Sequence, residues 1–216
     1  RRHTRFKCDW SSDVCSSDLP FSKASFLDVE DEQWQAETWR CFLRHCGGIA
    51  DLRRSPLVTP TKQFFPPSDA AGHARASYIF DFVKRHARMQ DWTCELAAQP
   101  QRPQMHVGEL AVLKSVKGGL PLGTFRVEGN NAVITYDPAS LDNPPQLIAT
   151  LAHELAHYRM MTFRHDLPGG EELHEFATDM MTVYMGFGIF GTSLAFNFRQ
   201  YQGGGIQGWS ASRQGY

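Results

Sequence analysis

The chain lacks a strong net charge and a long unbroken apolar run, and both absences exclude classes of partner. Lysine and arginine number 22 against 23 acidic residues, a net charge of −1, so no basic field attracts nucleic acid. The apolar stretch at 180–196 is short for a membrane span, and threonine, serine and glycine interrupt it. We therefore expect no nucleic-acid partner and no membrane span, and interpret this stretch as a buried core helix that ends in the Gly186–Gly191 region.

Paired cysteines are also missing. The five cysteines are an odd number, and none of them forms a C-x-x-C motif; they are Cys8, Cys15, Cys41, Cys46 and Cys94. This pattern argues against a disulfide framework and against a zinc knuckle. Reduced thiols are typical of the cytosol, so a cytoplasmic location is favoured.

The first nineteen residues read as foreign to the protein. Residues 10–14 and 15–19 form a near-repeat, and Cys15-Ser16-Ser17-Asp18-Leu19 resembles the translation of a common sequencing-adapter end. We interpret residues 1–19 as a non-native leader and exclude them from the fold prediction. Any native signal peptide would be missing with the true N-terminus, and the abrupt stop after a triple glycine predicts C-terminal truncation.

The remaining composition is that of a globular protein, with 42% apolar and 21% charged residues. Apolar periodicity predicts helices over 29–46 and about 70–89, and a strand over 92–97. A proline-rich connection at 55–69 separates the two helices. We expect an N-terminal helical region over residues 20–100 and a second region over residues 101–216.

The second region begins with strands and continues with helices. Three strands are predicted, at Val107–Lys117, Thr124–Glu128 and Ala132–Tyr136. Gly129-Asn130-Asn131 has the composition of a hairpin turn. Asn143-Pro144 then begins a helix over about 144–162, and acidic residues open another over about 171–187. The predicted fold class is α+β, with a small antiparallel sheet before the two helices.

His153-Glu154-Leu155-Ala156-His157 is an H-E-x-x-H motif on the first of these helices. A spacing of four residues places both imidazoles on one helix face, where both can bind one zinc ion. Glu154 points about 100° away from its neighbour, so it can reach a water molecule without being a ligand. Two ordinary surface histidines are the alternative, but the apolar flanks make this interpretation costly.

The third ligand separates the known types of H-E-x-x-H site. A histidine ligand in the pattern H-E-x-x-H-x-x-G-x-x-H is excluded, because the chain has Met160 and Phe163 where glycine and histidine are required. The next helix carries Glu175 and Asp179 as an E-x-x-x-D pair. Two antiparallel helices can present Glu175 to the metal, and Asp179 can then accept the free N–H of a histidine ligand.

H-E-L-A-H followed by a helix with E-x-x-x-D resembles the gluzincin clan of zinc metallopeptidases, as in the thermolysin and M48-type families, over roughly residues 105–190. The resemblance implies a zincin-like α+β fold and a Zn²⁺ cofactor held by His153, His157 and Glu175. It implies Glu154 as general base and a peptide or protein substrate. By the same analogy, the strand ending near Tyr136 borders the cleft and pairs with an extended substrate.

Several assignments remain open at this stage. Rival third ligands are Glu171, Glu172, His174, His165 and, in an aspzincin-like arrangement, Asp179. Candidate oxyanion donors are Tyr184, Arg199, His174 and Tyr216. The predicted function is a zinc-dependent hydrolase that cleaves peptide bonds. The alternatives are a zinc-stabilised binding or structural domain without turnover and a degenerate hydrolase domain that regulates a partner; Glu154 argues against the former, because a structural site needs no such carboxylate.

Overall fold

The computed structural model describes residues 27–100, 122–128 and 131–192 of the 216-residue chain. Several of the sequence predictions lie outside the described residues: the leader at 1–19, the strand at Val107–Lys117, the turn residues at 129–130 and the oxyanion candidates Arg199 and Tyr216.

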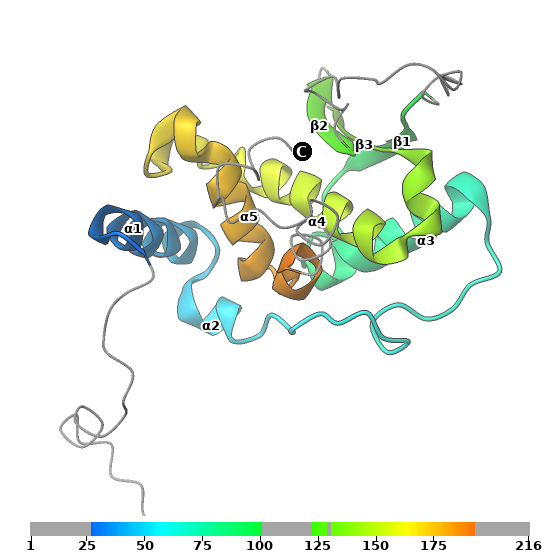
Figure 1. Cartoon of the computed structure of the whole chain (residues 1–216), viewed down its shortest axis with the longest axis horizontal. Helices are drawn as coiled ribbons and strands as arrows, with labels where there is room; N and C mark the ends of the chain where they lie inside the picture. Colours follow the sequence, from blue (N-terminus) through cyan, green and yellow to red (C-terminus); the bar gives the residue numbers. More distant parts are fainter. Residues whose placement is uncertain (1–26, 101–121, 129–130, 193–216) are drawn as a thin grey trace, which may run out of the picture.

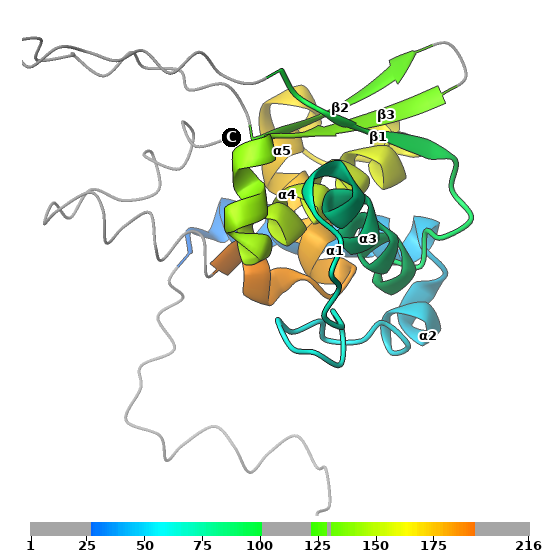
Figure 2. The same ribbon diagram turned by 90° about the vertical axis from the view of Figure 1, so that its right-hand side faces the viewer.

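The described residues form a small sheet layered against helices (Figure 1). In chain order the elements are α1 (Val29–His45), α2 (Gly48–Leu52), α3 (Gly72–His86), β1 (Cys94–Ala98), β2 (Gly123–Glu128), β3 (Asn131–Tyr136), the 3₁₀ turn η1 (Pro138–Asp142), α4 (Pro144–Met160), the 3₁₀ turns η2 (Arg164–Asp166) and η3 (Gly170–Leu173), and α5 (His174–Tyr184). Figure 2 shows the sheet lying along one side of α3 and α4. Helix α4 contacts the sheet, α3 and α5, so it occupies the middle of the fold.

The sheet is mixed, not antiparallel as predicted. Its strand order is β1-β3-β2, with β3 parallel to β1 and antiparallel to β2. Apolar patterning identifies strands but does not say which strands pair. Because β3 is paired along both edges, it cannot add a substrate strand, and the predicted pairing beside Tyr136 is wrong.

The helices begin and end close to where the sequence predicts. Helix α1 has acidic residues in its first turn and Arg44 and His45 in its last, which complement the helix dipole. The helix predicted from residue 171 begins as the 3₁₀ turn η3 and becomes α-helical at His174. In the apolar stretch, α5 ends at Tyr184, the chain turns at Gly186 with a φ of 97°, and residues 188–192 are helical again. No helix among the described residues is long and apolar enough to cross a membrane.

One hydrophobic cluster joins these elements. It contains buried residues of α1, α3, β3, α4 and α5. Phe42 of α1 is fully buried, and its ring lies 5.9 Å from that of Tyr184 and 6.4 Å from that of Phe163. Helix α1 therefore packs against both α5 and the segment that joins α4 to α5.

Helix α1 also bonds to that joining segment through polar atoms. The Trp34 indole donates to the Pro168 carbonyl at 2.9 Å. The Cys41 thiol donates to the backbone carbonyl of Asp166 at 3.5 Å, and His45 Nε2 lies 2.9 Å from the Asp166 carboxylate. The N-terminal helix thus holds the connection between the two helices that carry the predicted metal ligands.

Phe42→Ala is expected to lower the free energy of unfolding by about 3–5 kcal/mol, because it leaves a cavity where three aromatic rings meet. Urea denaturation followed by circular dichroism measures this change. Val29→Ala is the matched control, since this side chain is 68% exposed and its loss should change stability by no more than about 0.5 kcal/mol. Equal effects of the two substitutions would contradict the packing role of α1.

Candidate metal centre

Helix α4 brings the two motif histidines into the protein interior. Its first turn contains Pro144 and Pro145, which suit the positions where a helix has no N–H partner. His153 and Glu154 are each only 6% exposed, and the side chain of His157 is 15% exposed. The spacing of four residues turns both imidazoles toward α5, as the sequence predicts.

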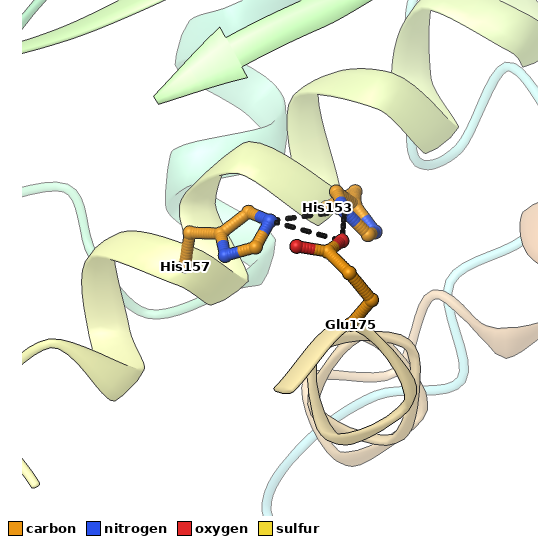
Figure 3. A group of neighbouring side chains, drawn as sticks. All are labelled: His153, His157 and Glu175. Atoms are coloured by element: carbon orange, nitrogen blue, oxygen red, sulfur yellow. Dashed lines mark hydrogen bonds and ion pairs between the residues drawn. The ribbon is translucent and has the colours of Figure 1, made fainter. Parts of the chain in front are cut away.

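Helix α5 supplies the third member of the group, Glu175 (Figure 3). Its oxygen Oε2 lies 3.3 Å from Nε2 of His153 and 3.5 Å from Nε2 of His157. The two Nε2 atoms are 3.1 Å apart. Three potential ligand atoms from two helices therefore converge on one point.

These separations fit a tetrahedral metal site. Two ligands bound to zinc at roughly 2.0–2.1 Å with tetrahedral angles are about 3.3–3.4 Å apart. The three observed separations, 3.1, 3.3 and 3.5 Å, lie around this value. One shared proton cannot satisfy two imidazole nitrogens and a carboxylate at once, whereas a divalent cation can. The group His153, His157 and Glu175 can thus hold a metal ion.

The far nitrogen of each imidazole has a hydrogen-bond partner, and the near nitrogens face the other members of the group. The Asp179 carboxylate lies 3.1 Å from Nδ1 of His153 and can accept its N–H. Thr178 donates its hydroxyl proton to the His174 carbonyl at 2.9 Å, so its oxygen is free to accept from Nδ1 of His157 at 3.4 Å. Each Nε2 then keeps a lone pair that a metal ion can use.

The contact of Thr178 was not anticipated from the sequence. Thr178 is fully buried and stands three residues after Glu175, so the two share a face of α5. That spacing was the available signal. It was missed because threonine is common inside helices without any partner of this kind.

The pKa values of His153, His157 and Glu175 are all shifted from their ordinary values. Burial lowers the pKa of His153, but its hydrogen bonds to Asp179 and Glu175 outweigh burial and raise this pKa to about 9. Burial lowers the pKa of His157. Hydrogen bonds from the neighbouring imidazoles, that of His153 first, hold the pKa of Glu175 far below its usual range. At neutral pH a metal ion must therefore displace a proton from His153.

Glu154 lies on the side of α4 that faces the sheet. Burial raises the pKa of its carboxyl to about 7. Its oxygen Oε1 is next to Gly123, the first residue of β2, where an added Cβ would lie 3.1 Å from Oε1 and 2.5 Å from Cγ2 of Thr150. The missing side chain of Gly123 is what allows β2 to approach α4 this closely. The sequence predicts a strand from Thr124 and gives no local signal for this role of Gly123.

The rival ligands proposed from the sequence are not part of the group. Within the described residues, the metal-binding cluster contains neither His165, Glu171, Glu172, His174 nor Asp179. The ring of His174 stacks on that of His157, with centroids 5.3 Å apart and planes 15° apart. It therefore remains beside the group as a neighbour.

The candidate oxyanion donors can be compared with the position of the group in the same manner. Tyr184 is a core residue whose hydroxyl donates to the Cys46 carbonyl at 3.3 Å. It stands nine residues beyond Glu175, about 13 Å along the helix axis at 1.5 Å per residue, so this assignment is wrong. Arg199 and Tyr216 lie outside the described residues. Of the two candidates that the structure describes, His174 lies next to the group.

Comparison of the chain with family models, with curated proteins and with solved structures finds no match. The site is therefore defined by the residues of this chain and their geometry.

Zinc binding to the metal-free protein is expected to release about one proton per ion at pH 7. The pKa of about 9 at His153 means that this imidazole is protonated before the metal binds, and a metal ligand must be neutral. Isothermal titration calorimetry in buffers of different ionisation enthalpy measures the released protons, and zinc affinity should fall as the pH is lowered. Uptake without proton release would contradict this account.

Gly123→Ala is expected to destabilise the protein by about 1–3 kcal/mol, because the new methyl group overpacks the contact between β2 and α4. Thr150→Ser removes the nearest atom, the threonine Cγ2, so the double variant should recover part of the lost stability. Chemical denaturation of the two single variants and the double variant gives the coupling. Strictly additive effects would show that the two residues do not meet.

Proposed function

We propose that this chain is a zinc-dependent hydrolase that cleaves peptide bonds, with His153, His157 and Glu175 as metal ligands and Glu154 as general base. The observation that supports it best is the near-tetrahedral spacing of three ligand atoms next to a buried glutamate of the same helix. The H-E-x-x-H motif and the following E-x-x-x-D pair resemble those of gluzincin peptidases, which adds the substrate class.

When bound, zinc would lower the pKa of a water ligand toward roughly 7 and polarise the scissile carbonyl. Glu154 takes a proton from the attacking water and later passes it to the leaving amine. A general base works best when its pKa lies near the working pH, and burial raises the pKa of Glu154 to about 7. Asp179 accepts a hydrogen bond from the Nδ1–H of His153, which keeps the ring in the tautomer whose Nε2 lone pair is free for the metal.

The number of ligands favours catalysis over a structural role. Structural zinc sites are usually closed by four protein ligands, whereas catalytic sites have three and leave one position for water. Three residues make up the group within the described parts of the chain. The side chain of Glu175 is 63% exposed, so solvent and substrate can approach from the α5 side.

A zinc-stabilised domain without turnover is the competing function. It would use the same three ligands, so metal binding alone does not separate the two. Glu154 does, because a carboxyl that is 6% exposed is costly to bury and has no use in a purely structural site. The distinguishing measurement is therefore turnover in a protein that still binds metal.

Glu154→Gln is expected to retain zinc and to lower kcat for peptide cleavage by about 10²–10⁴-fold, the usual contribution of a general base. His157→Ala should lose both zinc and turnover, because two ligands do not hold the ion tightly. Metal content by mass spectrometry and cleavage of a peptide library measure the two properties separately.

The control is Glu37→Gln, which changes an exposed glutamate of α1 and should leave both properties unchanged. Full turnover in Glu154→Gln would refute the assigned base. A wild-type protein that binds zinc and cleaves no peptide would favour the structural alternative.

A further inference from the structure

A surface hollow lies in the segment that joins the two metal-binding helices. Its volume is about 200 Å³. The residues that line it are Arg164, His165, Leu167, Gly170, Glu171 and His174. They come from η2, from Leu167 directly after it, from η3 and from the first residue of α5, so the hollow is bounded by the connection between α4 and α5.

The hollow borders the proposed metal centre through His174. One side of this residue lines the hollow, and its ring stacks on that of His157, 5.3 Å away. The next residue along the chain is Glu175, whose oxygen Oε1 lies 4.0 Å from Nδ1 of His174. A peptide whose reacting bond lies at the metal group can therefore place a neighbouring side chain or its terminus in the hollow.

The walls of the hollow are held in place before any ligand binds. Trp34 of α1 bonds to the Pro168 carbonyl, and Asp166 accepts from both Cys41 and His45. Gly169 turns the chain with a φ of 81°, a conformation that glycine adopts without strain. A preformed pocket loses less ordering entropy on binding than a loop that must first close.

The charges of the hollow indicate what it can bind. Within residues 27–100, 122–128 and 131–192, Arg164 has no carboxylate within ion-pair distance. Leu167, which is 6% exposed, gives the hollow an apolar surface. A guanidinium group binds a carboxylate through two parallel N–H bonds, a geometry that lysine does not provide. Glu171 also lines the hollow and repels a carboxylate, so it should oppose this binding.

We propose that this hollow is a substrate subsite that receives a carboxylate group of the peptide and that Arg164 selects it. The proposal rests on the proposed hydrolase function and names its substrate class: peptides with an acidic residue, or a free C-terminus, close to the cleaved bond. His174 lies between the subsite and the metal group, and Leu167 contacts the aliphatic part of the bound side chain.

The binding test uses the zinc-loaded Glu154→Gln protein, which should bind substrate without cleaving it. The probes are alanine-based octapeptides, acetylated and amidated, with one glutamate at each position in turn; a matched set carries glutamine. Fluorescence anisotropy gives each Kd. At one position, glutamate should bind up to about fivefold more tightly than glutamine, as expected for an ion pair with the exposed side chain of Arg164.

Adding Arg164→Gln should abolish the preference for glutamate and leave glutamine peptides unaffected. Adding Glu171→Gln should have the opposite effect and tighten glutamate binding by up to about fivefold, because a like charge is removed. Arg75→Gln is the control, since Arg75 is an exposed arginine of α3 that does not line the hollow. Arg164→Lys should restore only part of the preference.

The same probes with a free C-terminus distinguish the two sources of the carboxylate. If the terminal carboxylate occupies the subsite, a free C-terminus binds more tightly than the amide and Arg164→Gln removes that difference. If a side chain occupies it, only the position of glutamate matters. The proposal is overturned if no glutamate position and no free terminus improves binding, or if Arg164→Gln weakens all peptides equally.

Failure of the subsite and failure of the hydrolase function give different results. If the protein with Glu154 intact cleaves peptides but shows no preference for a carboxylate, the subsite proposal alone is contradicted. If acidic peptides bind in a way that depends on Arg164 but that protein does not cleave them, the hydrolase proposal is contradicted and the subsite is supported.

Discussion

Two imidazole nitrogens and a carboxylate oxygen lie about 3 Å apart where α4 meets α5, and much of the surrounding structure serves to keep them there. Such a group is unfavourable unless a cation or shared protons neutralise it, and burial makes it more so. The partners on the far side of each ring, Asp179 and Thr178, fix where the lone pairs point. The chemistry of the site follows from this convergence.

Helix α4 lies between the sheet and α5, so the residues of the H-E-x-x-H motif have different surroundings on its two sides. On the α5 side, His153 and His157 meet Glu175. On the sheet side, Glu154 lies against the start of β2, where Gly123 leaves room for its carboxyl. Helix α4 thus supplies two of the three residues that can hold a metal ion, and also a carboxyl whose pKa burial raises to about 7. Helix α1 secures the connection from α4 to α5 and with it the hollow beside the group.

The sequence predicted elements more reliably than their pairing. The helices over 29–46 and 144–162 and the strand ending at Tyr136 were recognised because their apolar periodicity is local. The mixed sheet was not, because parallel pairing of β1 with β3 joins segments far apart in the chain. The substrate-pairing role expected for the strand ending at Tyr136 failed for the same reason: periodicity does not reveal which strand lies at an edge.

The sequence alone determined that His153 and His157 lie on one face of a helix with Glu154 between them in the chain, because their mutual geometry depends only on the pitch of that helix. Glu175 was predicted as the acid that completes the group, but several residues near it in the chain remained as rivals. The tertiary structure separates them, because the crossing of α5 over α4 brings Glu175 to the imidazoles and turns Asp179 to the far side of one ring. The closeness of Gly123 to Glu154 and the hollow beside His174 likewise depend on how separate segments pack, which no local pattern contains.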